Sequence, residues 1–225
     1  MAELLREGKV DLYIDSPFPS LAMGHLSGST LLARRWKKGV AEYHSIIFAR
    51  KDSGIGRLED LKQKIIGFET PYSSSGHFLP KMVLLQQGFR LAAMEDPANA
   101  VDQGKMGYTF TGDEKNTLLW VLRGKVSAGV VDDQTYLKLA KDDINHWQII
   151  HRTYAVPRHI LSHRSNLPLK LARSIKDVLL KMDQSAQGAK ALKDFQGTTK
   201  FDDIPASQMA PIRQSWKFIE AEVAK

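Results

Sequence analysis

The chain has 225 residues, of which 43% are hydrophobic and 25% are charged. These values are ordinary for a globular protein and exclude a disordered, fibrous or membrane-embedded chain. No apolar run reaches the roughly 18–20 residues that a membrane-spanning helix needs, so we predict that the chain is not membrane-spanning. Its 32 Lys and Arg outnumber its 25 Asp and Glu and give a net charge of +7, which attracts anions in general.

One dense basic run, RRWKK at 34–38, is expected to form a solvated face. No stripe of basic and aromatic residues repeats elsewhere, so we predict no nucleic-acid partner. The chain has no cysteine, which removes disulfides, thiolate metal sites and cysteine nucleophiles but leaves the compartment open. No signal peptide is visible, because MAELLREGKV is charged where an apolar segment should lie.

Helical and strand patterns alternate along the chain. The segment AELLREG reads as the last turns of a helix ending at Gly8, followed by a strand in KVDLYI and a turn at DSPFPS. The next predicted strands are 42–52, 64–69, 107–111, 127–131, 146–154 and 158–163, and the predicted helices are 56–63, 75–87, 114–124, 134–141, 167–184, 186–195 and 207–225. Strands alternating with helices before a helical tail indicate an α/β protein with largely parallel sheets.

A cluster of three serines, Ser73, Ser74 and Ser75, precedes a glycine and an apolar helical segment. The first N–H groups of a helix lack partners within the helix, and the helix dipole favours negative charge there. Hydroxyls at this place predict a site for a phosphate-like oxyanion. The alternative is a plain helix cap, in which one serine caps the helix and the others are exposed. The segment is not a nucleotide-binding P-loop, because GxxxxGK[ST] is absent.

Other motifs give weaker indications. Neither GxSxG nor HExxH occurs. His159 and His163 are expected on one face of a strand, in structural rather than metal-binding roles. Asp132 and Asp133 follow a buried strand, where α/β proteins place ligand contacts, although either residue could instead cap the next helix. We predict no cofactor and no metal site.

Four blocks of this sequence, in their order, resemble the phosphate/phosphonate-type periplasmic substrate-binding proteins of ABC transporters. They are YHSIIFARKDSGIGRLEDLKQKIIGFETPYSSSGHFLPKMVLLQQGF, LLWVLRGKVSAGVVDDQTY, RTYAVPRHILSHRSNLP and VLLKMDQSAQGAKALKDFQGTTKF. The resemblance implies a two-lobed type II periplasmic-binding-protein fold, with one lobe formed by 1–54 plus 155–225 and the other by 55–154. It also implies that the first strand and helix of the fold are missing from this sequence.

The resemblance further implies that a ligand binds in the cleft between the lobes. The hydroxyls of Ser73, Ser74 and Ser75 would hold the oxygens of a phosphonate or phosphate, and Asp132 or Asp133 would contact the rest of the ligand. The turn at Asp15 and Ser16 matches the family's first cleft loop, and Tyr43 matches its tyrosine ahead of the crossing strand.

Two positions depart from the family's pattern. Where the family often has a histidine after a glycine, this chain has TGDEKN, with Asp113, and Ser127 replaces an aspartate in the next strand. A carboxylate at Asp113 disfavours a purely anionic ligand and favours one that also carries a positive group. Alternatively, Asp113 caps the helix that begins at Glu114.

By this resemblance the chain is the solute-binding component of an ABC importer, is periplasmic or extracytoplasmic, and performs no chemistry. Its expected partners are a small oxyanion ligand (phosphonate, phosphate or related) and the permease subunits. The alternatives are a ligand-sensing module of the same fold coupled to a signalling partner, and an enzyme, for which no nucleophile and base can be named.

Overall fold

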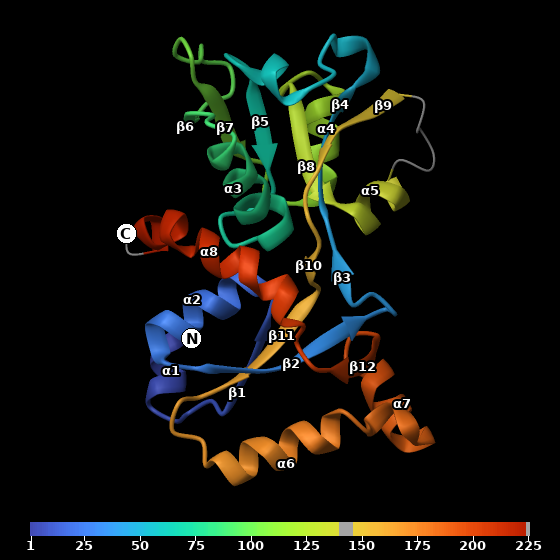
Figure 1. The fold of residues 1–225 in the computed structure, drawn as a ribbon. Coiled ribbons are helices and arrows are strands. Elements are labelled where there is room, and N and C mark those ends of the chain that lie inside the picture. Colours follow the sequence, from blue (N-terminus) through green and yellow to red (C-terminus); the bar gives the residue numbers. More distant parts are fainter. Residues whose placement is uncertain (140–145, 224–225) are drawn as a thin grey trace. The chain divides into compact units, whose positions relative to one another are not determined.

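The computed structural model describes residues 1–139 and 146–223, which form two compact units (Figure 1). The first unit comprises Met1–Tyr43 and Ala155–Lys225, and the second comprises His44–Tyr154. The chain therefore passes between the units twice. The first passage falls earlier than the predicted boundary at residue 54, because the strand Ser45–Arg50 pairs within the sheet of the second unit.

A four-stranded sheet, a separate two-stranded pair and their covering helices form the first unit. Its elements are α1 (Ala2–Arg6), β1 (Leu12–Asp15), α2 (Pro17–Ser27), β2 (Thr30–Lys37), β3 (Glu42–Tyr43), β10 (Val156–Pro157), β11 (His159–His163), α6 (Leu169–Leu179), a 3-10 turn (Met182–Gln184), α7 (Ala186–Asp194), β12 (Thr198–Asp202) and α8 (Ala206–Val223). The short strands β3 and β10 pair separately.

A six-stranded sheet organises the second unit. Its elements are β4 (Ser45–Arg50), 3-10 turns at Lys51–Ser53 and Leu58–Leu61, β5 (Ile65–Phe68), a π-helical turn (Ser74–Phe78), α3 (Leu79–Gln86), β6 (Leu91–Ala93), β7 (Met106–Phe110), α4 (Glu114–Leu122), β8 (Ala128–Asp132), α5 (Asp133–Leu139) and β9 (Trp147–Arg152). The predicted helix 134–141 begins one residue later than α5, and its last two residues lie outside the described part.

The sheet of the second unit has the order β6-β7-β5-β8-β4-β9. Strands β6, β7, β5 and β8 are parallel, whereas β4 is antiparallel to both of its neighbours. Its two faces are buried: Ile47 of β4 lies in one apolar cluster and Phe48 in the other. Leu84 of α3 joins the first cluster, while Val121 of α4 joins the second. The parallel prediction is therefore confirmed for four strands of this sheet.

The sheet of the first unit corrects that prediction, since every pairing in its order β1-β11-β2-β12 is antiparallel. Strands β1 and β2 are joined through α2, as in a parallel strand–helix–strand unit. The later strand β11 is inserted between them and runs the opposite way. An alternation of strands and helices along the sequence does not reveal such an insertion.

The predicted turn at DSPFPS is the beginning of α2, which the sequence analysis missed. Ser16 is the extended residue before the helix, and Pro17 occupies the first helical position. Proline is well suited to this position, because its fixed φ is helical and its missing N–H would be unbonded there. Strand β2 follows directly, after Gly28 ends the helix in the left-handed conformation.

The basic run at 34–38 is a solvated face only in its last part, since its two arginines are buried while Lys38 is exposed. Arg34 and Arg35 lie in β2 and are 8% and 1% exposed. Arg34 donates to both carboxylate oxygens of Asp202 in the neighbouring strand, at 2.8 and 2.6 Å. Arg35 donates to the Thr198 hydroxyl at 2.7 Å and lies over the ring of Phe195. Both guanidinium groups are thus bound by residues of β12 and, for Arg35, by Phe195 before it.

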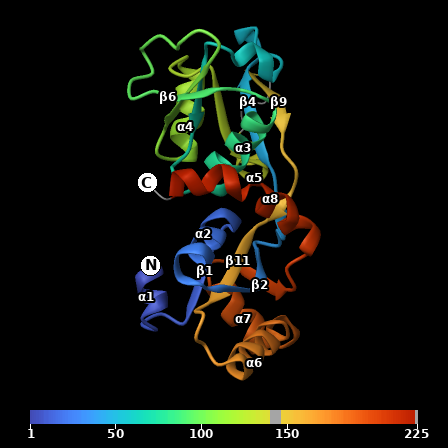
Figure 2. The same cartoon turned by 60° about the vertical axis from the view of Figure 1, so that its left-hand side comes forward.

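Strand β12 also interrupts the predicted helical tail, which otherwise consists of α6, α7 and α8. Helices α6 and α7 contact this sheet (Figures 1 and 2), where Ala172 and Leu192 pack with Leu32 and Phe201. Residues 224–225 of the last predicted helix lie outside the described part. None of the helices described is long and apolar enough to cross a bilayer.

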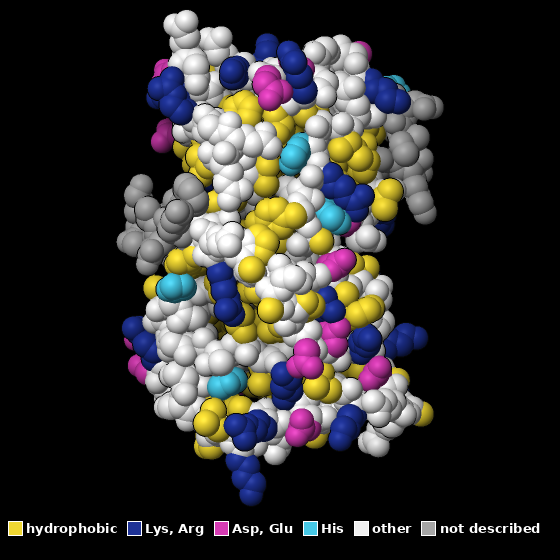
Figure 3. All heavy atoms as spheres, in the orientation of Figure 1, with side chains coloured by type: hydrophobic (Ala, Val, Ile, Leu, Met, Phe, Trp, Pro, Cys, Tyr) yellow, Lys and Arg dark blue, Asp and Glu magenta, His cyan; other side chains and the backbone are white. Residues whose placement is uncertain are grey.

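The net positive charge does not form a single basic field on the face seen in Figure 3. Lysine and arginine side chains are interspersed there with aspartate and glutamate over both units. The excess charge therefore does not by itself mark a binding surface on this face.

We predict that Asp202→Asn lowers the free energy of unfolding by about 2 kcal/mol at pH 7, because it leaves the buried Arg34 without its counter-ion. Burial, the largest single influence, would raise the pKa of Asp202, but hydrogen bonding, first from Arg34, and the positive charges of Arg34 and Lys200 together outweigh it and hold the pKa below its ordinary value. The wild-type advantage should therefore be full above about pH 4 and shrink as pH falls through the folded-state pKa.

Urea unfolding at several pH values measures this difference. The exposed Asp183→Asn is the matched control and should leave stability unchanged. An equal loss in both variants at pH 7 would contradict a stabilising role for the buried pair.

Candidate functional site at the strand ends of the second unit

The carboxyl ends of β5, β7 and β8 meet at one edge of the second unit's sheet. Strand β5 pairs in parallel with β7 on one side and with β8 on the other. Three connections therefore begin side by side, after Phe68, Phe110 and Asp132. This edge is where open parallel sheets bind ligands, and it gathers six of the nine predicted site residues, namely Ser73, Ser74, Ser75, Asp113, Asp132 and Asp133.

The serine cluster begins the helix that follows β5. Ser73 caps the helix, because its Oγ accepts from the N–H of Gly76 at 2.9 Å. Ser74 and Ser75 occupy the first turn and are 1% and 6% exposed. The capping alternative therefore holds for Ser73, but Ser74 and Ser75 are buried rather than exposed.

That first turn is a π-helical turn rather than an α-helical one. The N–H of Phe78 donates to the carbonyl of Ser73 at 3.0 Å, five residues back. The wider turn spreads the backbone around the serines, and π-turns of this kind are frequent at functional sites. The N–H groups in the first turn of a helix have no carbonyl acceptor within the helix, and here the N–H of Gly76 donates to the Ser73 hydroxyl instead.

Gly76 packs against Glu69, the first residue after β5. A Cβ atom at Gly76 would lie 2.5 Å from both Cβ and Oε2 of Glu69, and 2.9 Å from Oγ of Ser73. No side chain fits there without moving its neighbours. The half-buried Glu69 carboxylate therefore lies beside the turn that carries the serines, and the sequence analysis did not single it out.

A buried histidine fixes the segment before the serines. Nδ1 of His77 lies 2.9 Å from the carbonyl oxygen of Pro71. A carbonyl only accepts, so Nδ1 carries the proton and donates. The ring is 4% exposed and packs against Phe68 at the end of β5 and Phe110 at the end of β7. His77 thus ties the loop around Pro71 to both strand ends.

The loop after β7 is anchored to the same strand end. Gly112 donates to the Glu69 carbonyl at 2.9 Å and adopts a φ of 92°, in the left-handed range that favours glycine. Asp113 accepts from the backbone N–H of Asn116 at 2.7 Å and from its side chain at 3.2 Å. It therefore caps α4, as the second interpretation of this residue predicted.

The two aspartates after β8 differ in their surroundings. Asp132 is 3% exposed and accepts from the N–H of Thr135 at 2.8 Å. The hydroxyl of Thr135 in turn donates to the carboxylate of Glu114 at 2.8 Å, and this hydrogen bond links the start of α5 to the start of α4. Asp133 is 9% exposed, and its Oδ2 atom lies 3.3 Å from Nη2 of Arg152, with which it forms an ion pair.

The other oxygen of Asp133, Oδ1, is buried and has no hydrogen-bond donor among the described residues. A buried carboxylate oxygen without a donor is costly. This oxygen is therefore the acceptor at the sheet edge best placed to gain from a ligand's N–H group. Arg152, its partner on the other oxygen, was not predicted from sequence.

The remaining three predicted residues belong to the first unit. Asp15 accepts from Tyr13 at 2.6 Å and from the N–H of Ser16 at 2.6 Å. Burial, followed by this hydrogen bond, raises the pKa of Tyr13, so the tyrosine stays a donor to Asp15. Tyr43 is 1% exposed and lies under the guanidinium of Arg158. These contacts hold the side chains of Asp15 and Tyr43 within their own unit.

Comparison with known proteins adds a family and a fold. Residues 1–209 match the family described as ABC transporter, phosphonate, periplasmic substrate-binding protein. The Xanthomonas citri protein XAC2383 bound to ATP has the same fold, with a TM-score of 0.87 at 24% identity over 100% of this chain and 81% of that chain.

Two further solved structures share the fold at lower similarity. A binding protein component of an ABC phosphonate transporter from Pseudomonas aeruginosa gives a TM-score of 0.66 at 23% identity, over 97% of this chain and 72% of that chain. PhnD1 from Prochlorococcus marinus in complex with methylphosphonate gives a TM-score of 0.68 at 17% identity, over 97% of this chain and 82% of that chain.

We predict that Gly76→Ala destabilises the second unit by about 1–3 kcal/mol, the usual cost of forcing an extra methyl group into a packed position. The new Cβ would displace Glu69 and the Ser73 cap together. Urea unfolding measures the loss. Gly56→Ala is the control, because a Cβ there meets nothing within 4 Å, and it should be neutral or slightly stabilising. Equal stability of the two variants would show that this close approach is absent.

Proposed function

This chain belongs to the family of periplasmic substrate-binding proteins of phosphonate ABC transporters, and on that premise we propose that it captures a small ligand carrying a phosphonate or phosphate group. The observation that carries the proposal is the first helical turn at Ser74 and Ser75, where hydroxyls and helix N–H groups coincide. Hydrogen bonds from fixed donors to a charged oxygen are the strong ones, and a helix dipole adds to them.

The ligand's other end is expected to carry a positive group. Glu69 lies at the serine turn, and Asp133 has one buried oxygen without a donor. Near these carboxylates a purely anionic ligand is repelled, and the repulsion grows as water is excluded. An aminoalkyl phosphonate would place its oxyanion at the serines and donate its ammonium hydrogens to the Asp133 carboxylate. Asp113 is a weaker candidate for this role, since it caps α4.

The wider role follows from the family. We propose that the protein acts outside the cytoplasm, delivers its ligand to permease subunits of an ABC importer and carries out no chemistry itself. A sensor of the same fold would bind its ligand in the same way and differ only in its partner. Copurification with a permease, rather than with a signalling protein, would distinguish the two.

The double change Ser74→Ala, Ser75→Ala should weaken phosphonate binding by about 100-fold, because two hydrogen bonds to a charged group are lost at about 1.5 kcal/mol each. Isothermal titration calorimetry with methylphosphonate and an aminoalkyl phosphonate measures the change. Both serines are buried, so a thermal melt must first show that the variant is folded. Ser174→Ala, at an exposed position in α6, is the control, and unchanged affinity in the double variant would reject the oxyanion assignment.

Asp133→Asn tests the positive end of the ligand. In the wild type, the aminoalkyl phosphonate should bind more tightly than phosphate or methylphosphonate, because its ammonium reaches a carboxylate. The asparagine should reduce this preference by about tenfold or more, since a charge-assisted hydrogen bond contributes about 1.5–3 kcal/mol. Asp113→Asn is the matched comparison and should preserve the preference. If phosphate binds most tightly to the wild type, the zwitterion proposal is wrong.

A further inference from the structure

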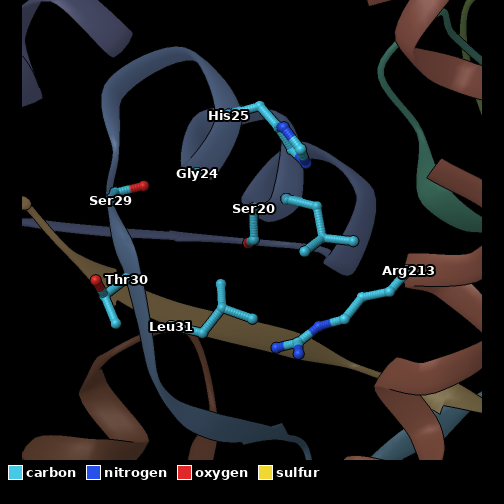
Figure 4. A pocket seen from close by; sticks show the side chains of 8 residues that line it. Ser20, Gly24, His25, Ser29, Thr30, Leu31 and Arg213 are labelled. Atoms are coloured by element: carbon cyan, nitrogen blue, oxygen red, sulfur yellow. The ribbon is translucent and has the colours of Figure 1, made fainter. Parts of the chain in front are cut away.

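A second hollow lies wholly within the first unit, between α2, the start of β2 and α8 (Figure 4). Its volume is about 360 Å³. This size lies within the range of small-molecule sites, roughly 300–1,000 Å³. The lining residues are Ser20, Leu21, Gly24, His25, Ser29, Thr30, Leu31 and Arg213. None of them is a carboxylate, and none belongs to the sheet edge of the second unit.

Ser29 brings an unpaired hydroxyl to this hollow. The residue is 8% exposed, and its Oγ has no hydrogen-bond partner among the described residues. The backbone is fixed, because the Ser29 N–H donates to Oγ of Ser27 at 3.3 Å and Gly28 turns the chain in the left-handed conformation. In Figure 4 the Ser29 hydroxyl points toward the α2 side of the hollow. A buried hydroxyl normally has a partner, so a ligand oxygen would satisfy it.

Arg213 supplies a charge on the opposite side. Its side chain extends from α8 toward Leu31 of β2 (Figure 4). Its guanidinium makes no ion pair or hydrogen bond with any described residue. The hollow therefore has a cation and an unsatisfied hydroxyl without any carboxylate to neutralise them, while Leu21 and Leu31 give it an apolar part.

Two stacked aromatic rings join α2 to α8 at this hollow. The His25 ring lies parallel to the indole of Trp216, with ring centroids 4.3 Å apart and an interplanar angle of 4°. Trp216 is 7% exposed. His25 lines the hollow and stacks on Trp216, so the indole is a natural reporter of occupancy.

We propose that this hollow is a second ligand site, which takes a small organic oxyanion with a short apolar tail. Arg213 donates to one oxygen of the anionic head, and the Ser29 hydroxyl, on the opposite side of the hollow, donates to the other oxygen. The tail packs on Leu21 and Leu31. Inorganic phosphate lacks such a tail and would leave the apolar part of the hollow unfilled. The proposal does not depend on the ligand of the second unit.

The test uses butyrate as the probe and the indole N–H signals of the ¹⁵N-labelled full chain as the readout. Trp216→Phe identifies the Trp216 signal among the four tryptophans. We expect butyrate to shift that signal saturably, and butanol and butylamine to bind at least about tenfold more weakly, because the alcohol is neutral and the amine is positively charged, so neither carries an anionic head. Arg213→Gln and Ser29→Ala should each weaken butyrate binding, by about tenfold or more for the arginine.

Two controls make the outcome specific. Arg173→Gln removes an exposed arginine of α6 that does not line the hollow, and it should bind butyrate as the wild type does. The double variant Ser74→Ala, Ser75→Ala should also keep butyrate binding, which separates this site from the phosphonate site. Equal binding of butanol and butyrate, no loss in Arg213→Gln, or no saturable shift of the Trp216 signal would each overturn the proposal.

Discussion

Two backbone hydrogen bonds at Glu69 hold together the loops that carry the proposed phosphonate site. Its N–H donates to the Gly76 carbonyl at 3.0 Å, and its carbonyl accepts from the Gly112 N–H at 2.9 Å. Glu69 directly follows β5, which pairs with both β7 and β8. These backbone bonds therefore help to fix the serine turn and the start of α4, together with the side-chain bonds of Ser73 and Asp113. Substitutions at the strand ends can then alter the ligand without disturbing the frame.

Elements with local signals were predictable from sequence. Strands β5 and β8 are short buried runs, and α4 begins at the Asp113 cap and ends before Gly124. The buried arginines were not, because the pattern RRWKK has no local sign of burial. The partners of Arg34 and Arg35, Asp202 and Thr198, are 168 and 163 residues away in sequence. Only the pairing of β2 with β12 brings them together, which also explains why β12 was missed.

The candidate site shows the same division between local and distant information. The place of its serines at the start of a helix was predictable, because hydroxyls before an apolar helical segment are typical of a helix N-terminus. Their contact with an oxyanion stays a prediction. The roles of the aspartates were not predictable, since the same residue type caps helices and binds ligands. The structure separates them: Asp113 and Asp132 accept from N–H groups of their own helices, whereas one oxygen of Asp133 has no such donor. The Glu69 contact was hidden because a π-turn folds Gly76 back onto it.

The net charge of +7 therefore does not describe how the proposed site of the second unit would select an anion. Its candidate donors at the serine turn are hydroxyls and backbone N–H groups, and carboxylates lie close by at Glu69 and Asp133. The peptide dipoles at a helix N-terminus attract an oxyanion but carry less than one full positive charge. Each nearby carboxylate therefore lowers the affinity for a ligand that carries only negative charge. This penalty increases with burial. Asp133, which is 9% exposed, is therefore the residue whose charge should weigh most on selectivity, more than the exposed Asp113 or the general surface charge.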